Sequence, residues 1–204
     1  LSIPDAFEVW LILGLHFDGT LEGDAITDAM NHSHNIRLEG EPGDGGIDAW
    51  HHDLQNNTLY LYQAYWPDDV NDTAGIMKAR EIKNAINYLE SYGEGGERQG
   101  RAGTLLRDLL SAFLEIKNTS GKVVLRLASG GGISSQAKQE MKSCSDYGGL
   151  EVAQESWSIA RLLNFISTED LSGESIDFNF YSNPGLYYQF EGDWSSVSNA
   201  YSTT

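Results

Sequence analysis

Residues 47–66 constrain the fold most strongly, because two β-forming runs here flank a short polar turn. The second run is the denser of the two, with Leu59, Tyr60, Leu61 and Tyr62 in succession. The three residues over 55–57 separate the runs and are of turn-forming type. The segment therefore predicts a β-hairpin with strands over 47–52 and 58–66.

The apolar period changes after this hairpin. Residues 76–89 and 105–114 carry apolar side chains at helical spacing, and a polar, glycine-rich loop over 93–103 separates them. Residues 122–128 contain a continuous apolar run of the kind found in buried parallel strands. A hairpin joined through helices to a parallel strand predicts an α/β fold with a mixed sheet flanked by helices.

Further elements are expected on both sides of this region. They are helices over 4–15 and 23–31, a helix ending near 143, a strand over 150–156, a helix over 158–166 and a strand over 176–180. We divide the chain into a domain over 1–150 and a segment over 151–204. That segment either continues the domain or begins a following region.

The charge of the chain limits its partners. The net charge is −17, and only 13 Lys and Arg residues are present, although phosphate binding rests mainly on these residues. If nucleic acid is the partner, the basic surface lies in a missing part of the protein or in another protein. Alternatively, the source is an organism whose proteins are acidic throughout. The third alternative is a domain that never contacts nucleic acid.

Location and membrane contact follow from two further features. The longest apolar run, around residues 9–13, is shorter than the roughly 20 residues that cross a bilayer, so no membrane partner is expected. A single cysteine, Cys144, forms no internal disulfide framework. We expect a cytoplasmic protein, and since the chain begins with Leu1, a piece of a longer one.

The segment most informative about chemistry runs from Asp44 to Trp50 and is followed by Gln63, fifteen residues after Asp48. Asp48 falls within a predicted strand, where Asp is disfavoured, which indicates a site more than a scaffold. An Asp and an oxygen-bearing side chain on paired hairpin strands can meet at one point. Mg²⁺ prefers such hard oxygen ligands, with water and substrate phosphate completing the shell.

The sequences DGGIDA (44–49) and LYLYQA (59–64) resemble two half-motifs of the PD-(D/E)XK nuclease superfamily. More narrowly, they are similar to the N-terminal domain of the abortive-infection phage resistance (AIPR) family. The resemblance covers roughly residues 3–145 and implies a restriction-endonuclease-like fold that uses Mg²⁺ or Mn²⁺. It implies that Asp48 and Gln63 are catalytic and hold the metal, with Glu8 as a further ligand.

The chain departs from this pattern at Tyr65, where the family has a catalytic Lys. A phenol supplies no permanent positive charge. Lys78 and Lys83 are the nearest replacements, and we take Lys78 as the catalytic candidate. The alternative interpretation gives these residues no catalytic role: Lys78 and Lys83 are then solvated lysines on a helix, and Glu8 is a surface residue.

Other chemistry-bearing residues are interpreted as structural. The five histidines lack cysteine partners and a His-Glu-x-x-His helix, and we expect them on surfaces or in loops. The three glycines at 130–132 match neither nucleotide-binding pattern and predict a flexible connection. The tryptophans are expected in the core more than in stacking on bases.

Two functions remain open from the sequence. The first is a metal-dependent nuclease of anti-phage defence that acts on nucleic acid, with DNA favoured over RNA. The second is a catalytically lapsed module, marked by Tyr65, that serves binding, sensing or assembly. In either case a homo-oligomer or a larger complex can form through regions outside this chain.

Overall fold

The computed structural model describes residues 3–17, 27, 29–30, 45–69, 71–93, 104–143 and 145–168. Most of the helix predicted over 23–31, the start of the glycine turn, Cys144 and the strand predicted over 176–180 lie outside these ranges. The chain divides into two compact units, Leu1–Leu162 and Leu163–Thr204. The first unit contains the sheet and every candidate site residue, and strand Glu151–Trp157 belongs to it.

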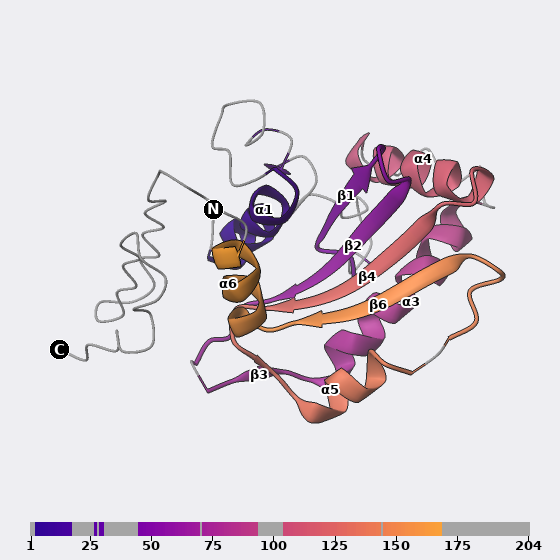
Figure 1. Ribbon diagram of the computed structural model, residues 1–204. Coiled ribbons are helices and arrows are strands. Elements are labelled where there is room, and N and C mark those ends of the chain that lie inside the picture. Colours follow the sequence, from indigo (N-terminus) through magenta and orange to yellow (C-terminus); the bar gives the residue numbers. More distant parts are fainter. Residues whose placement is uncertain are drawn as a thin grey trace. The chain divides into compact units, whose positions relative to one another are not determined.

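The described chain contains both helices and strands (Figure 1). In order they are α1 (Ile3–His16), β1 (Ala49–Asp53), β2 (Thr58–Tyr65), β3 (Thr73–Ala74), α3 (Ile76–Gly93), α4 (Thr104–Asn118), β4 (Lys122–Ser129), β5 (Gly132–Ile133), α5 (Ser135–Glu140), β6 (Glu151–Trp157) and α6 (Ile159–Thr168). The elements predicted over the described residues are all present, with boundaries that differ by a few residues.

The main sheet has four strands in the order β1-β2-β4-β6. Strands β1 and β2 form the predicted antiparallel hairpin, while β4 pairs in parallel with both β2 and β6. The short strands β3 and β5 form a separate parallel pair. The fold is therefore mixed α/β, with a mixed sheet flanked by helices. Among the described helices, none has the length and apolar character needed to span a bilayer.

The hairpin turn is fixed by polar contacts of its own residues. The Asp53 carboxylate accepts hydrogen bonds from the backbone N–H groups of Gln55 and Asn56, both at 3.0 Å. Asn57 takes a positive φ of 49°, which Asn tolerates better than most residues. The two strands pair with Ala49 opposite Tyr62, and this register decides which residues face one another beyond β1.

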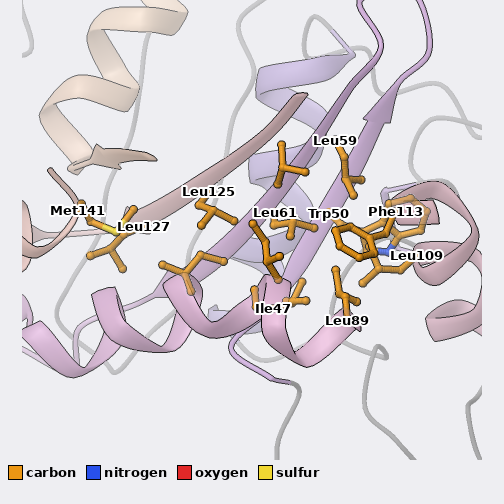
Figure 2. Packing of buried hydrophobic residues seen from close by; sticks show 14 of the residues in the cluster. Ile47, Trp50, Leu59, Leu61, Leu89, Leu109, Phe113, Leu125, Leu127 and Met141 are labelled. Carbon is orange, nitrogen blue, oxygen red and sulfur yellow. The ribbon is translucent and has the colours of Figure 1, made fainter. Parts of the chain in front are cut away.

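One face of the sheet is covered by helices α3 and α4 and holds the main apolar core (Figure 2). Leu59 and Leu61 of β2 contribute to it, together with Leu89 of α3 and Phe113 of α4, each no more than 1% exposed. Helix α1 packs on β1 and β2, where His16 contacts the rings of Tyr60 and Tyr62, the residues that alternate with Leu59 and Leu61. The two sides of the sheet therefore receive different side chains from the same strand.

The triple glycine after β4 is a site of close packing. A Cβ atom built on Gly130 would overlap the ring of Trp66, and one on Gly131 would lie 3.0 Å from Pro67. Gly132 begins β5 and leaves similarly little room beside Thr73. The prediction of a flexible connection is wrong here, because the glycines are needed where two segments of the chain approach closely.

Candidate functional site

Asp48 and Gln63 lie directly opposite each other at the end of the hairpin. Asp48 immediately precedes β1 instead of lying within it as predicted, but its N–H still donates to the Tyr62 carbonyl at 2.8 Å. This bond extends the pairing of Ala49 with Tyr62 by one position and sets Asp48 beside Gln63. The juxtaposition predicted from the two half-motifs is therefore present.

The side chains of this pair are in direct contact. The Oδ2 atom of Asp48 accepts hydrogen bonds from the Gln63 side-chain amide and, at 2.7 Å, from the Ala64 backbone N–H. Gln63 is only 2% exposed, and its Oε1 atom has no hydrogen-bond partner within the described part of the chain. A buried carbonyl oxygen without a partner is costly, so this atom is a natural place for a ligand. We call Asp48, Gln63 and Ala64 the hairpin-end cluster.

The hairpin-end cluster contains oxygens of the type that Mg²⁺ prefers, namely the Asp48 carboxylate, the orphaned Gln63 Oε1 and the neighbouring Ala64 carbonyl. The Gln63 amide presents its NH2 group to Asp48 and to the Ala64 carbonyl, so all three oxygens could bind one cation only after this amide rotates. No group of three or more His, Cys, Asp and Glu side chains suited to a metal occurs among residues that the structure describes. A cation here would be held by few protein ligands, as is usual for Mg²⁺.

The turn before Asp48 is docked tightly against α3. Gly45 and Gly46 have φ values of 67° and 79°, a region that disfavours residues with a Cβ atom. A Cβ on Gly46 would also lie 2.6 Å from the backbone carbonyl oxygen of Glu81. The two glycines of the DGGIDA stretch thus bring the first turns of α3 next to the hairpin-end cluster.

Lys78 lies in the first turn of α3, at this same end of the sheet. Its ammonium group is 2.9 Å from the Glu81 carboxylate, and the two side chains are 38% and 41% exposed. Burial raises the pKa of Tyr65, Asp72 and Asp68 raise it further, and the charge of Lys78 opposes them. The hydroxyl of Tyr65 is therefore neutral at pH 7 and lies within the electrostatic range of Lys78.

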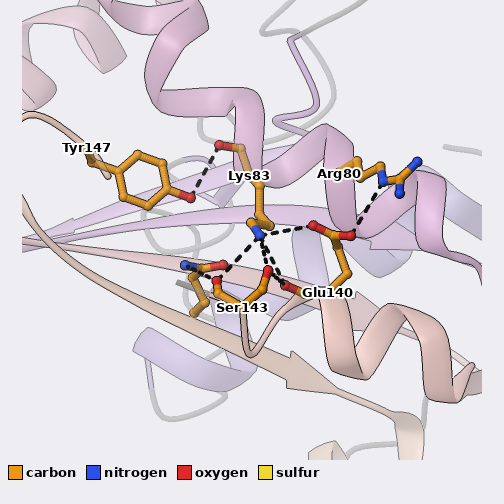
Figure 3. A network of polar contacts seen from close by, with 6 residues as sticks. Arg80, Lys83, Glu140, Ser143 and Tyr147 are labelled. Atoms are coloured by element: carbon orange, nitrogen blue, oxygen red, sulfur yellow. Dashed lines mark hydrogen bonds and ion pairs between the residues drawn. The ribbon is translucent and has the colours of Figure 1, made fainter. Parts of the chain in front are cut away.

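Lys83, the other lysine considered, belongs to a structural contact (Figure 3). Its ammonium group donates to the Glu140 carboxylate at 3.0 Å and to the Glu140 carbonyl at 3.1 Å. It also contacts Ser143, and its side chain is only 10% exposed. These bonds fasten α3 to α5 and the segment that follows, which favours Lys78 over Lys83 as the site cation.

Glu8 lies on α1, which packs against β1 and β2. The neighbouring Phe7 ring meets Trp66 edge-on at 5.3 Å, just beyond the end of β2. Helix α1 thus reaches the same end of the hairpin as Gln63, but α1 and α3 lie on different sides of the sheet (Figure 1). Glu8 would have to approach a metal at the hairpin-end cluster from the side opposite Lys78.

A second group of polar residues, missed by sequence reasoning, lies on the α1 side of the sheet. The guanidinium of Arg126 donates to Glu155 Oε2 at 2.8 Å and to the Tyr62 hydroxyl at 2.6 Å. That hydroxyl is 2.7 Å from His16 Nε2. The rings of Tyr60 and Trp157 stack on the guanidinium, with their centroids 4.5 and 4.7 Å away. We call His16, Tyr62, Arg126, Glu155 and Trp157 the arginine cluster.

The charges of the arginine cluster are matched internally. Burial opposes the charge on Arg126, but Tyr62 and Glu155 outweigh it and raise its pKa. Burial would raise the pKa of Glu155, yet Arg126 holds it below its usual range. Burial, His51 and Arg126 together lower the pKa of His16 to about 2.

The prediction of surface or loop histidines is wrong for His16. Its ring stacks on His51 at 4.1 Å beneath α1 and is hydrogen-bonded to Tyr62. The sequence did contain one indication of this cluster. Arg126 lies inside the apolar run of β4, and a buried guanidinium needs hydrogen-bonding partners.

The chain matches no protein-family model, no curated protein and no solved structure. The resemblance of DGGIDA and LYLYQA to the AIPR family therefore stays a prediction, as does the restriction-endonuclease-like fold.

Proposed function

We propose that this chain carries a metal-dependent nuclease domain of the restriction-endonuclease-like type, acting in anti-phage defence. The observation that carries the proposal is the hairpin-end cluster, where Gln63 keeps a buried amide oxygen unpartnered beside the Asp48 carboxylate. The order helix, hairpin, helices, parallel strand agrees with this fold type. The defence context rests on the AIPR-like half-motifs alone.

The residues of the cluster have distinct roles in this proposal. Asp48, Gln63 and the Ala64 carbonyl would hold Mg²⁺ or Mn²⁺, with Glu8 as a further ligand. When bound, such a cation lowers the pKa of water and neutralises charge on the phosphodiester. Lys78 would place its charge against the phosphate from α3, in the role that Tyr65 cannot take as a neutral phenol.

A catalytically lapsed module is the second candidate, and one observation favours it. Asp48 Oδ2 already accepts two hydrogen bonds from β2, as expected of a carboxylate that merely fastens the start of a strand. Tyr65 and the net charge of −17 agree with this alternative. Binding, sensing or assembly within a larger complex would then be the function.

Cleavage of supercoiled plasmid DNA and of single-stranded RNA with Mg²⁺ or Mn²⁺ tests the proposal. We expect Asp48→Asn to lower the rate by at least about 100-fold, because a metal ligand is lost. Asp53→Asn is the matched control, since Asp53 lies at the other end of β1 in a turn contact. Its rate should stay within about twofold of the wild-type rate.

Tyr65→Lys separates the two candidates. If the wild-type protein cleaves neither substrate but Tyr65→Lys does, the site has lapsed and the second candidate stands. If neither protein cleaves while circular dichroism shows an intact fold, the nuclease proposal is rejected.

A further inference from the structure

Lys78 occupies a position in α3 that helix stability alone disfavours. It is the third residue of an 18-residue helix whose first turn holds no acidic residue. The N-terminal end of a helix carries partial positive charge, so a cation here is repelled. Its ion pair with Glu81, with Lys before Glu in the sequence, is also the less favourable order on a helix. A residue that local rules disfavour often marks a functional site.

A backbone contact places the Lys78–Glu81 pair near the hairpin-end cluster. The backbone of Glu81 packs on Gly46, two residues before Asp48. Lys78 lies three residues before Glu81 in α3, and its ammonium group is 2.9 Å from the Glu81 carboxylate. The pair therefore lies close to the half of the predicted metal site that Asp48 provides.

We infer that Glu81 is a positioning residue, which holds the Lys78 ammonium group toward the phosphate of a bound nucleic acid. The inference rests on the proposed nuclease function. Lysine has a long, flexible side chain, and a lysine reaching from a helix needs a partner to define where its charge lies. Glu81 supplies that partner at 2.9 Å and is itself fixed by the close contact of its backbone with Gly46.

The matched control is Glu90, whose ion pair joins α3 to Lys117 of α4 and is similarly exposed. Glu90, near the other end of α3, is 2.8 Å from Lys117, with side chains 35% and 42% exposed. Glu81→Gln and Glu90→Gln therefore make the same chemical change in two ion pairs of similar exposure. Because exposed pairs contribute little to stability, each variant should melt within about 2 °C of the wild-type protein.

Kinetics on plasmid DNA with Mg²⁺ then isolates the role of Glu81. We expect Glu81→Gln to lower kcat about tenfold with KM nearly unchanged, because a misplaced charge affects the transition state. Glu81→Asp should recover part of the loss, and Glu90→Gln should lose nothing. The swap of Lys78→Glu with Glu81→Lys restores an ion pair but moves the cation, so it should stay slow. Equal rates for Glu81→Gln and Glu90→Gln overturn the inference.

A second readout does not depend on turnover. The chain has six lysines, so the ¹³Cε resonances of labelled lysine can be followed one by one. Adding a phosphorothioate DNA duplex with Mg²⁺ should shift the Lys78 resonance in the wild-type protein and much less in Glu81→Gln. A shift at Lys78 without cleavage supports the pair as a phosphate-binding element while the nuclease proposal fails. An unmoved Lys78 resonance in a protein that cleaves overturns the inference and leaves the nuclease proposal standing.

Discussion

The hairpin-end cluster and the arginine cluster both bury polar groups against strand β2, and they differ in how these groups are satisfied. In the arginine cluster, the cation, the anion and the hydroxyl are joined by hydrogen bonds of 2.6–2.8 Å. In the hairpin-end cluster, the Asp48 carboxylate meets a neutral amide, and the oxygen of that amide has no partner among the described groups. Since an unsatisfied buried group costs free energy, the second arrangement stabilises the fold less than the first.

Under the proposed function, the difference corresponds to a structural role for the arginine cluster and a ligand-binding role for the hairpin-end cluster. The arginine cluster joins three strands to α1 through side chains that complete one another, so it is suited to hold the sheet and helix together. The hairpin-end cluster keeps an unpartnered amide oxygen at the end of the sheet, and under the proposed function this oxygen binds a ligand. Perturbing the first should therefore change stability, and perturbing the second should change ligand binding and rate.

The largest effect on stability is expected for Arg126→Met. Glu155 and Tyr62 would lose their shared partner while remaining largely covered, and breaking such a pair costs about 3 kcal/mol. Urea unfolding followed by tryptophan fluorescence measures the change. Arg80→Met is the control, because the Arg80 side chain is 55% exposed and its pair with Glu140 should contribute less than about 1 kcal/mol. Similar losses for both variants would show that the arginine cluster stabilises the fold no more than an exposed ion pair does.

Sequence reasoning located the hairpin-end cluster because the information is local. Asp48 and Gln63 are fifteen residues apart in one hairpin, and the hairpin follows from β-forming runs around a polar turn. The glycines before Asp48 indicated a turn, but their contact with Glu81 depends on how α3 packs. The pairing of Lys78 with Glu81 was therefore visible only in the structure.

The arginine cluster could not be predicted from the sequence because its members are distant along the chain. His16 and Tyr62 are 46 residues apart, and Tyr62 and Arg126 are 64 apart. Each residue alone has an ordinary interpretation: a histidine ending a helix, a β-forming tyrosine, and an arginine in a strand. The parallel pairing of β2 with β4 sets Tyr62 opposite Arg126, and the packing of α1 on β1 and β2 brings His16 to Tyr62.

The second-largest effect on stability is expected when the pH is lowered, because of His16. His16 has a pKa of about 2 in the fold and an ordinary value of 6.5, so below pH 6.5 the unfolded chain binds a proton that the folded chain does not. The contribution of His16 is therefore complete above pH 6.5 and is lost as the pH falls. Between pH 7.5 and 5.5 we expect a loss of about 1.4 kcal/mol.

Urea unfolding at these two pH values measures this loss, and His16→Gln should reduce it. The lowered pKa values of Asp53, Glu140 and Glu155 act only below about pH 4.5, outside this window. His52→Gln is the control, since His52 lies on the same strand as His51 but has no part in the arginine cluster. A pH dependence that persists in His16→Gln would show that His16 does not lie in a buried, neutral state.

The smallest effect on stability is expected for Gln63→Leu, and this variant sharpens the comparison most directly. Leucine removes the unsatisfied oxygen and also the hydrogen bond to Asp48, so the two changes oppose each other. Without metal, the free energy of unfolding should stay within about 1 kcal/mol of the wild-type value. With about 10 mM Mg²⁺ and millimolar affinity, the wild-type protein should gain about 1.4 kcal/mol, and the variant should not.

Gln154→Leu is the matched control for this variant. Gln154 also keeps a buried amide oxygen without a hydrogen-bond partner, and its Nε2 atom donates to the Ser143 carbonyl at 3.3 Å. If an orphaned amide oxygen were enough to bind Mg²⁺, both variants would lose part of the gain. If the Asp48 carboxylate beside the amide is required, only Gln63→Leu loses it. A large loss of stability in Gln63→Leu without metal would instead assign Gln63 the structural role that Arg126 has on the other side of the sheet.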